Sequence, residues 1–179
     1  YTTSVRTINW TVLANGDYTY NVTVVDRVSF QNTTSSRAIR LDTFAPNGTL
    51  IAPTNNSFVN NATQNYTANL TDNLGLKNAT LNIYNSSNAL VNQTTTTFGS
   101  GVVNTLVGTV VTLVDGVYNW FYNFFDYSGN SFVTSNGTVV IDTVIPLVQF
   151  VSPTETSGTY LARNYILVNA TASDTNLAN

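Results

Sequence analysis

The commonest residues in this sequence that could undergo a chemical reaction are asparagines followed two positions later by serine or threonine. The Asn-x-Ser/Thr pattern is the acceptor for N-linked glycosylation. With 26 Asn, 30 Thr and 14 Ser, the composition yields about six such patterns by chance. The sequence contains thirteen, at Asn9, Asn21, Asn32, Asn47, Asn55, Asn61, Asn65, Asn69, Asn78, Asn85, Asn92, Asn136 and Asn169. We therefore expect several of these asparagines to carry covalent N-glycans.

The phase of these patterns suits a β-strand. Successive strand residues point to opposite faces, so the Asn and its Ser/Thr share the solvent face when the middle residue points toward the core. The patterns at 21–23, 65–67, 69–71, 78–80 and 169–171 have this phase, with an apolar or aromatic middle residue. A solvent face also favours Asn and Thr for their own sake, so the phase supports glycosylation without requiring it.

Carboxylates are the second group of residues that could do chemistry. Calcium binds carboxylate oxygens, and seven aspartates lie near predicted strand ends and joints. These are Asp26, Asp42, Asp72, Asp115, Asp126, Asp142 and Asp174. No loop has the dense alternation of acids that is typical of a strong calcium motif, and turn formation explains isolated aspartates. The sequence therefore assigns no metal ligand, and bound Ca2+ is the secondary interpretation of these residues.

Catalysis has little support in this composition. The chain has no His and no Cys, which excludes Ser-His-Asp and Cys-His arrangements, His-based metal sites and disulfides. A glycosidase pair would have to use Glu155, the only Glu. Six Lys and Arg against nine Asp and Glu leave no basic stripe for nucleic acid. We expect neither an enzyme nor a nucleic-acid-binding protein, and no cofactor.

The elements that position these residues are predicted to be β-strands. High Asn and Thr content disfavours helix, and residues 18–24 alternate apolar and polar side chains as a half-buried strand does. Residues 8–12 and 38–42 also resemble strands. Between residues 46 and 143 we expect seven short strands, at 48–52, 64–71, 79–84, 89–93, 106–113, 118–125 and 138–142. Short strands separated by turns indicate a β-sandwich.

An internal repeat divides the chain. Identical residues recur 100 positions apart without a gap, at Gly16 and Gly116, Tyr18 and Tyr118, Asp26 and Asp126, Asp42 and Asp142, Thr43 and Thr143, and Pro46 and Pro146. The period predicts the end of one repeat at 1–45, a complete repeat at 46–143 and the beginning of a third at 144–179. Proline in the two joints, 42–46 and 142–146, restricts the backbone and favours a semi-rigid rod.

The segment 115–120, Asp-Gly-Val-Tyr-Asn-Trp, resembles the tyrosine corner of immunoglobulin-like domains, with Tyr118 as the corner residue. Tyr18 has the same place in the earlier repeat, and Trp120 stands where the family has the second cysteine of its disulfide. Together with residues 126–130 and the joints, the chain resembles the tandem immunoglobulin-like repeats of prokaryotic, especially archaeal, surface proteins. The resemblance implies all-β tandem immunoglobulin-like β-sandwiches with a period of about 100 residues. It also implies an extracellular stalk, adhesin, filament or cell-envelope protein.

One difference between the repeats indicates a contact surface. Phe121 and Phe125 replace Asn21 and Val25 on the predicted outer face of the strand. Exposed aromatic residues in a row are typical of a contact with another chain or with the adjoining repeat. The alternative is that loops of the same domain cover both faces of this strand.

These features together favour an extracellular structural protein that forms a glycosylated surface fibre, stalk or filament through self-association or neighbouring repeats. The alternative is an adhesin or binding module whose end loops or tyrosines recognise carbohydrate or protein on another surface. No apolar run reaches the roughly 18–20 residues of a membrane helix. No signal peptide precedes Tyr1, so an export signal is expected outside this sequence or already removed.

Glycosylation is tested by the intact mass of material from the native source. We expect that mass to exceed the mass of the bare polypeptide, 19.4 kDa for these 179 residues, by several glycans. The same chain from an expression host that adds no sugar is the control. A native mass equal to that of the bare polypeptide would contradict the prediction.

Overall fold

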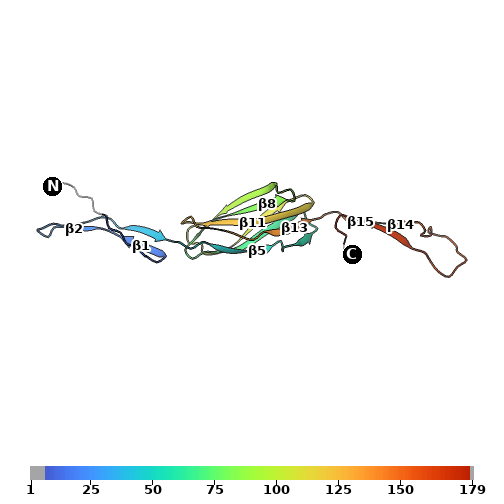
Figure 1. Cartoon of the computed structure of the whole chain (residues 1–179), viewed down its shortest axis with the longest axis horizontal. Helices are drawn as coiled ribbons and strands as arrows, with labels where there is room; N and C mark the ends of the chain where they lie inside the picture. Colours follow the sequence, from blue (N-terminus) through green and yellow to red (C-terminus); the bar gives the residue numbers. More distant parts are fainter. Residues whose placement is uncertain (1–6, 178–179) are drawn as a thin grey trace.

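The structure is a computed structural model that describes residues 7–177 of the 179-residue chain. All regular structure in these residues is β-strand, which confirms the predicted all-β class. The described residues form no helix, and hence no apolar helix of the length needed to cross a membrane. Figure 1 shows a wide central unit, residues 47–141, between two narrow segments that extend in opposite directions.

The central unit contains two sheets. Its strands are β5 (Asn47–Ala52), β6 (Ser57–Val59), β7 (Thr63–Thr71), β8 (Leu76–Asn85), β9 (Leu90–Thr97), β10 (Asn104–Thr112), β11 (Gly116–Asp126), β12 (Ser131–Val133) and β13 (Gly137–Ile141). One sheet has the strand order β10-β7-β5, and the other has the order β6-β13-β11-β8-β9, with β12 paired to β11. Neighbours are antiparallel except β6 and β13. Both sheets contribute to one buried cluster, an arrangement consistent with a β-sandwich.

Large rings fill the space between the two sheets. Trp120 on β11 is fully buried, and its ring lies edge-on to Tyr66 on β7, with centroids 5.1 Å apart. The ring centroid of Tyr122 lies 6.4 Å from that of Trp120. The hydroxyl of Tyr122 donates a hydrogen bond of 2.8 Å to the backbone carbonyl of Tyr66. This bond connects the two sheets directly. Burial raises the pKa of Tyr66 to about 12 and also raises the pKa of Tyr122, so both phenols remain neutral at ordinary pH.

The strand predictions need three corrections. The central unit has nine strands instead of the predicted seven, and the two additional strands are β6 and β12. Each is only three residues long and is stabilised by pairing with β13 or β11, so its own sequence has no alternating pattern that would predict it. Residues 8–12 form no strand, since their counterparts in β10 pair with β7 and the described N-terminal residues contain no such partner. The predicted strand at 18–24 is interrupted after Tyr20.

The two flanking segments each consist of short strand pairs. Their strands are β1 (Gly16–Tyr20), β2 (Thr23–Val25), β3 (Gln31–Thr33), β4 (Arg37–Leu41), β14 (Leu147–Val151) and β15 (Asn169–Ser173). The pairs are β1 with β4, β2 with β3, and β14 with β15, all antiparallel. The register of β1 with β4 is that of β11 with β13 shifted by 100 residues: Gly16 pairs with Leu41, and Gly116 pairs with Ile141.

The inner face of the N-terminal segment is exposed. Tyr20, Val22 and Val24 are 41%, 45% and 66% exposed, whereas the residues 100 positions later are fully buried. The sequence predicts that this face packs in a core, and within the described residues it does not. Alternation identifies the apolar face of a strand, but it does not supply the second sheet that must cover it.

The two corner tyrosines make the same bond. The hydroxyl of Tyr118 donates to the carbonyl of Val114 at 3.0 Å, and the hydroxyl of Tyr18 donates to the carbonyl of Ala14 at 2.8 Å. Burial, with a smaller effect of the Asp115 carboxylate, raises the pKa of Tyr118. Each tyrosine side chain therefore fixes the turn that precedes its own strand by a hydrogen bond to the backbone of that turn.

The contribution of the corner bond is tested by Tyr118→Phe. This variant keeps the buried ring and removes one hydrogen bond, so we expect the free energy of unfolding to fall by about 1 kcal/mol in urea denaturation followed by tryptophan fluorescence. Tyr160→Phe is the control, because Tyr160 is fully exposed, and we expect no measurable change. Equal stability of Tyr118→Phe and the wild type would show that the bond does not stabilise the fold.

Candidate functional site

The joint between β4 and β5 is held by hydrogen bonds from both sides. The guanidinium of Arg40 donates to the carbonyl of Leu74 at 3.1 Å. The Asn73 amide donates to the Asp42 carboxylate at 3.1 Å, and the Asn130 amide donates to the Asp42 carbonyl at 3.2 Å. Residues of the N-terminal segment are therefore attached to two loops of the central unit.

The second joint, between β13 and β14, repeats part of this arrangement. The amide of Asn176 donates to the Asp142 carboxylate at 2.7 Å. Asp142 also accepts a bond from the backbone N–H of Val144 at 3.1 Å, just as Asp42 accepts one from Phe44 at 3.1 Å. An aspartate thus fixes the start of each joint.

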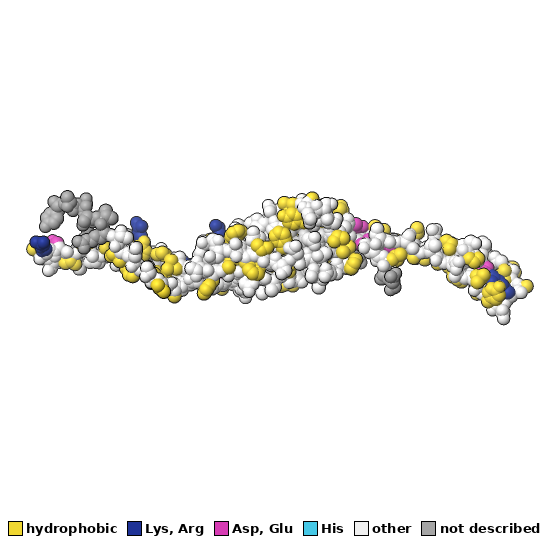
Figure 2. All heavy atoms as spheres, in the orientation of Figure 1, with side chains coloured by type: hydrophobic (Ala, Val, Ile, Leu, Met, Phe, Trp, Pro, Cys, Tyr) yellow, Lys and Arg dark blue, Asp and Glu magenta, His cyan; other side chains and the backbone are white. Residues whose placement is uncertain are grey.

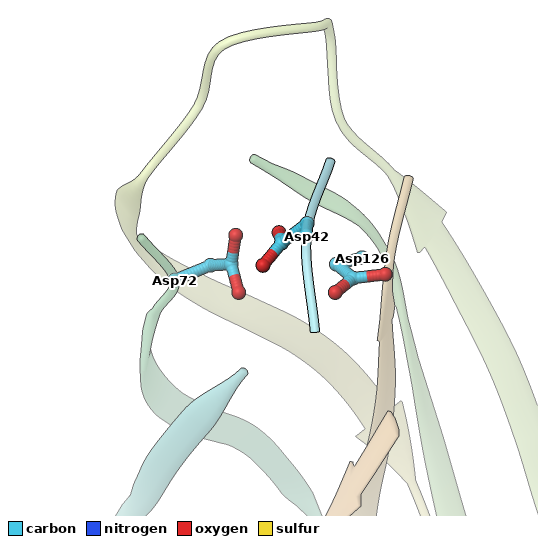
Figure 3. Close-up of side chains that lie close together, drawn as sticks. All are labelled: Asp42, Asp72 and Asp126. Carbon is cyan, nitrogen blue, oxygen red and sulfur yellow. The ribbon is translucent and has the colours of Figure 1, made fainter. Parts of the chain in front are cut away.

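Three aspartates meet at the first joint (Figure 3). Asp42 begins the joint, Asp72 follows β7 and Asp126 ends β11, and one carboxylate oxygen from each lies within 4.8 Å of the others. Asp126 is fully buried, and its two oxygens accept bonds from the backbone and side-chain amides of Asn130 at 2.8 and 2.7 Å. The sequence names all three aspartates separately, but only the sheet topology brings them together.

Hydrogen bonds also orient the other two carboxylates. One oxygen of Asp72 accepts the backbone N–H groups of Leu74 and Gly75 at 2.9 and 2.5 Å. The Oδ1 atom of Asp42 accepts bonds from the backbone N–H of Phe44 and from the side-chain amide of Asn73. Such an arrangement of oxygen atoms could hold a hard cation. The remaining predicted aspartates, Asp26, Asp115, Asp142 and Asp174, belong to no such cluster within residues 7–177.

Arg40, at the end of the N-terminal segment, makes its ion pair outside the cluster. Arg40 forms a two-pronged ion pair with Asp17, at 2.5 and 2.8 Å. Hydrogen bonding to Arg40 lowers the pKa of Asp17, and hydrogen bonding to Asp17 raises the pKa of Arg40. The guanidinium makes no hydrogen bond to the three clustered carboxylates among the contacts that the structure describes. The cluster therefore lacks a protein cation in direct contact.

Most predicted glycosylation acceptors are exposed. Ten of the thirteen asparagines are exposed to solvent: Asn9, Asn21, Asn32, Asn47, Asn55, Asn61, Asn65, Asn69, Asn136 and Asn169. The other three, Asn78, Asn85 and Asn92, are half-buried. The side-chain oxygen of Asn85 accepts two backbone bonds of its own turn, from Ser87 and Ala89. Asn92 pairs with Ile83 in the register, which places it on the inner face of an edge strand.

The two predicted lateral-contact residues differ in exposure. Phe125 is 37% exposed, whereas Phe121 is half-buried and stacks on Tyr84 with centroids 6.0 Å apart. All three lie on the outer face of the six-stranded sheet, opposite the core. Figure 2 shows hydrophobic side chains scattered over the visible face of the central unit, with few charged ones among them.

A cleft of about 360 Å³ lies beside the core, between β5 and the loop before β13. Its lining includes Trp120, Phe132 and Leu50, together with hydroxyl and amide side chains, and no described lining residue is charged. Gly137 is required there, because a Cβ at this position would lie 2.7 Å from the indole nitrogen of Trp120. No local sequence pattern indicates this cleft, because its walls come from opposite ends of the central unit.

Glu155 lies in the loop between β14 and β15. It forms an ion pair with Arg163, and it accepts the backbone N–H of Leu167 at 3.2 Å. The contact with Arg163 ties down the loop between β14 and β15. The contacts described for Glu155 thus stabilise its own loop.

The relation of this chain to known proteins is distant. No family model and no curated protein matches it. Among solved structures it is similar to dimeric latent PorU from Porphyromonas gingivalis, with 18% identity and a TM-score of 0.41. The similarity covers 72% of this chain and 12% of that chain. The match is to a small part of a longer protein, and it carries no argument about function.

Proposed function

We propose that this chain is part of an extracellular structural protein, built from tandem immunoglobulin-like repeats, that forms a glycosylated surface fibre, stalk or filament. The observation that carries the proposal is the recurrence of one strand register and one joint after 100 residues. Gly16 and Gly116 have equivalent strand partners, and Asp42 and Asp142 accept equivalent backbone bonds. Units that repeat with a fixed joint form an extended array in which each unit contacts its neighbours.

The bonds across the first joint support a rod over a freely jointed chain. Arg40 reaches the loop after β7, and Asn130 reaches back from the loop after β11 to Asp42. Domains linked only by flexible residues move independently, whereas bonds on two sides of a short joint restrict its bending. A restricted joint suits a protein whose task is to span distance.

The uncovered faces of the flanking segments fit the same proposal. On the N-terminal segment, Trp10, Leu13, Tyr18 and Ile39 help to line an open apolar groove. In the central unit the equivalent face of β11 and β13 is covered by the sheet β10-β7-β5. In an array, the missing strands of each flanking repeat would come from further residues of the chain or from a neighbouring subunit.

Glycans would have a physical task on this surface. Asn65 and Asn69 point outward from β7, the central strand of the three-stranded sheet, and both are exposed. Sheet proteins usually rely on charged residues to prevent edge-to-edge association, and only 8% of this chain is charged. Bulky hydrated sugars would take over that protection.

The outer face of the six-stranded sheet is the proposed surface for lateral contact. Phe125, Val117 and Phe58 are 37%, 42% and 68% exposed on strands of this sheet. Their pairing places Phe58 beside Val140 and Val140 beside Val117, in one row across three strands. An uncharged apolar row allows two rods to meet without repulsion between like charges.

A second candidate function, carbohydrate binding by an adhesin, is favoured by the cleft beside Trp120. Aromatic rings next to neutral hydroxyl and amide groups are the chemistry that suits an uncharged sugar. Thr54, Asn55, Ser135 and Asn136 supply such groups around the cleft. The recurrence of the joint has no part in this second function, so the structural function remains the first proposal.

The structural function is tested by electron microscopy of native material labelled with an antibody against residues 47–141. We expect label at regular intervals along extended polymers, because each repeat would present the same epitope. Label on isolated projections with a distinct tip would favour the adhesin instead. Label confined to the cell interior would contradict both functions. An antibody pre-adsorbed with the purified chain is the control.

The lateral surface is tested by replacing both Phe121 and Phe125 with Asn in protein that carries no sugar. We expect weaker concentration-dependent association in analytical ultracentrifugation, with the circular dichroism of the monomer unchanged. Replacing both Leu106 and Val110 with Asn is the matched control, because these residues are 65% and 66% exposed on the outer face of the other sheet. Equal loss of association in both double variants would remove the assignment to this face.

A further inference from the structure

We propose that Asp42, Asp72 and Asp126 bind one calcium ion at the joint between the N-terminal segment and the central unit. The site would join three parts of the chain: the start of the joint, the end of β7 and the end of β11. It goes beyond the proposed fibre, because a single chain could bind the ion without any assembly.

The spacing of the carboxylates fits one ion of this size. One oxygen from each aspartate lies within 4.8 Å of the others. Calcium binds oxygen at about 2.3–2.6 Å, so two oxygens on opposite sides of the ion are about 4.6–5.2 Å apart. An upper limit of 4.8 Å falls within this span, so the three oxygens are spaced closely enough for one calcium ion to lie among them.

The burial of Asp126 also favours a bound cation. Asp126 is fully buried, and the described residues give it hydrogen bonds only from the uncharged Asn130. Burying an ionised carboxylate without a cation is unfavourable, and two further carboxylates close to it increase the cost. Arg40 interacts with the charge of Asp42 from a distance, but its hydrogen bonds go to Asp17 and to a backbone carbonyl.

An oxygen without a partner points to the ligand independently of the clustering. The Oδ1 atom of Asp72 is buried and has no hydrogen-bond partner among the described residues, although Oδ2 of the same side chain accepts two backbone N–H groups. Figure 3 shows the Asp72 carboxylate directed toward the carboxylate of Asp42. Buried polar atoms are nearly always satisfied, so this oxygen requires a cation or a water molecule. The backbone bonds to Oδ2 hold the side chain in that direction.

The second joint has a reduced form of the same arrangement. Asp142 is the counterpart of Asp42, and Asp174 follows β15 as Asp72 follows β7. The Oδ2 atom of Asp174 is likewise buried without a hydrogen-bond partner in the part of the chain that the structure describes. Within residues 7–177 no third carboxylate is grouped with these two, so we expect weaker binding there, because calcium affinity follows the number of charged ligands.

Calcium binding is tested on the full 179-residue chain, produced without sugar, stripped with EDTA and then titrated with CaCl2 by calorimetry. We expect one tightly bound ion per chain. We also expect Tm to rise with Ca2+ and to return to its lower value with EDTA, since a ligand of the folded state stabilises it by mass action. No heat and no change in Tm up to about 10 mM Ca2+, above the range of weak extracellular sites, would overturn the proposal. An equal rise with MgCl2 would overturn the assignment to calcium.

Two matched variants locate the ion. Asp42→Asn keeps the acceptor for the N–H of Phe44 and removes one charged ligand, so binding should weaken by at least about tenfold. Without calcium this variant should be at least as stable as the wild type, because repulsion between carboxylates decreases. Asp142→Asn makes the equivalent substitution 100 positions later and keeps the acceptor for the backbone N–H of Val144. It should change the calcium affinity of the three-carboxylate site by less than about twofold.

The outcomes of this comparison separate binding from folding. If Asp42→Asn does not fold, Asp72→Asn takes its place, because its amide oxygen can still accept the N–H groups of Leu74 and Gly75. Retention of full affinity by the variant of the first joint would overturn the proposal. An equal loss in Asp42→Asn and Asp142→Asn would do the same, because it would place the ion outside the three-carboxylate cluster.

Discussion

Packing of one sheet against another is the constraint on which this structure depends. In the central unit, Trp120 lies between Tyr66 and Tyr122, and the hydroxyl of Tyr122 bonds to the backbone of the opposite sheet. A strand with one apolar face is stable only when a second layer removes that face from water. The central unit has both layers within residues 47–141, whereas the described part of each flanking segment has strands from one layer only. The buried centre and the exposed ends of the chain follow from this single difference.

The same packing creates the joint. Asp72 and Asp126 lie at the ends of β7 and β11, strands of opposite sheets, so the face-to-face packing of the sheets brings these ends close together. The incoming chain places Asp42 between them. A cluster of carboxylates is therefore a consequence of where two sheets end, and it lies where the N-terminal segment meets the central unit. A cation bound there would make the stability of the joint depend on the concentration of that ion.

The outer surfaces follow a different rule from the core. The two sheets need matching inner faces, but nothing in the packing fixes their outer faces, which are free to differ between repeats. Asn21 and Phe121 are an example, since the first lies in a glycosylation pattern and the second stacks on Tyr84. Residues 100 positions apart can therefore differ in surface chemistry while the strand register stays the same, as the pairing of Gly16 with Leu41 and of Gly116 with Ile141 shows.

Local patterns in the sequence determined the strand class, the 100-residue period and the positions of most long strands. Alternation and turn residues act over a few positions, and such short-range preferences are readable without the fold. The strands β6 and β12, the cleft beside Trp120 and the meeting of Asp42, Asp72 and Asp126 were decided only by the tertiary structure. Each depends on segments distant in sequence being placed together by sheet packing. The exposure of Tyr20 and Val24 was decided in the same way, because the sequence states which face of a strand is apolar but not what covers it.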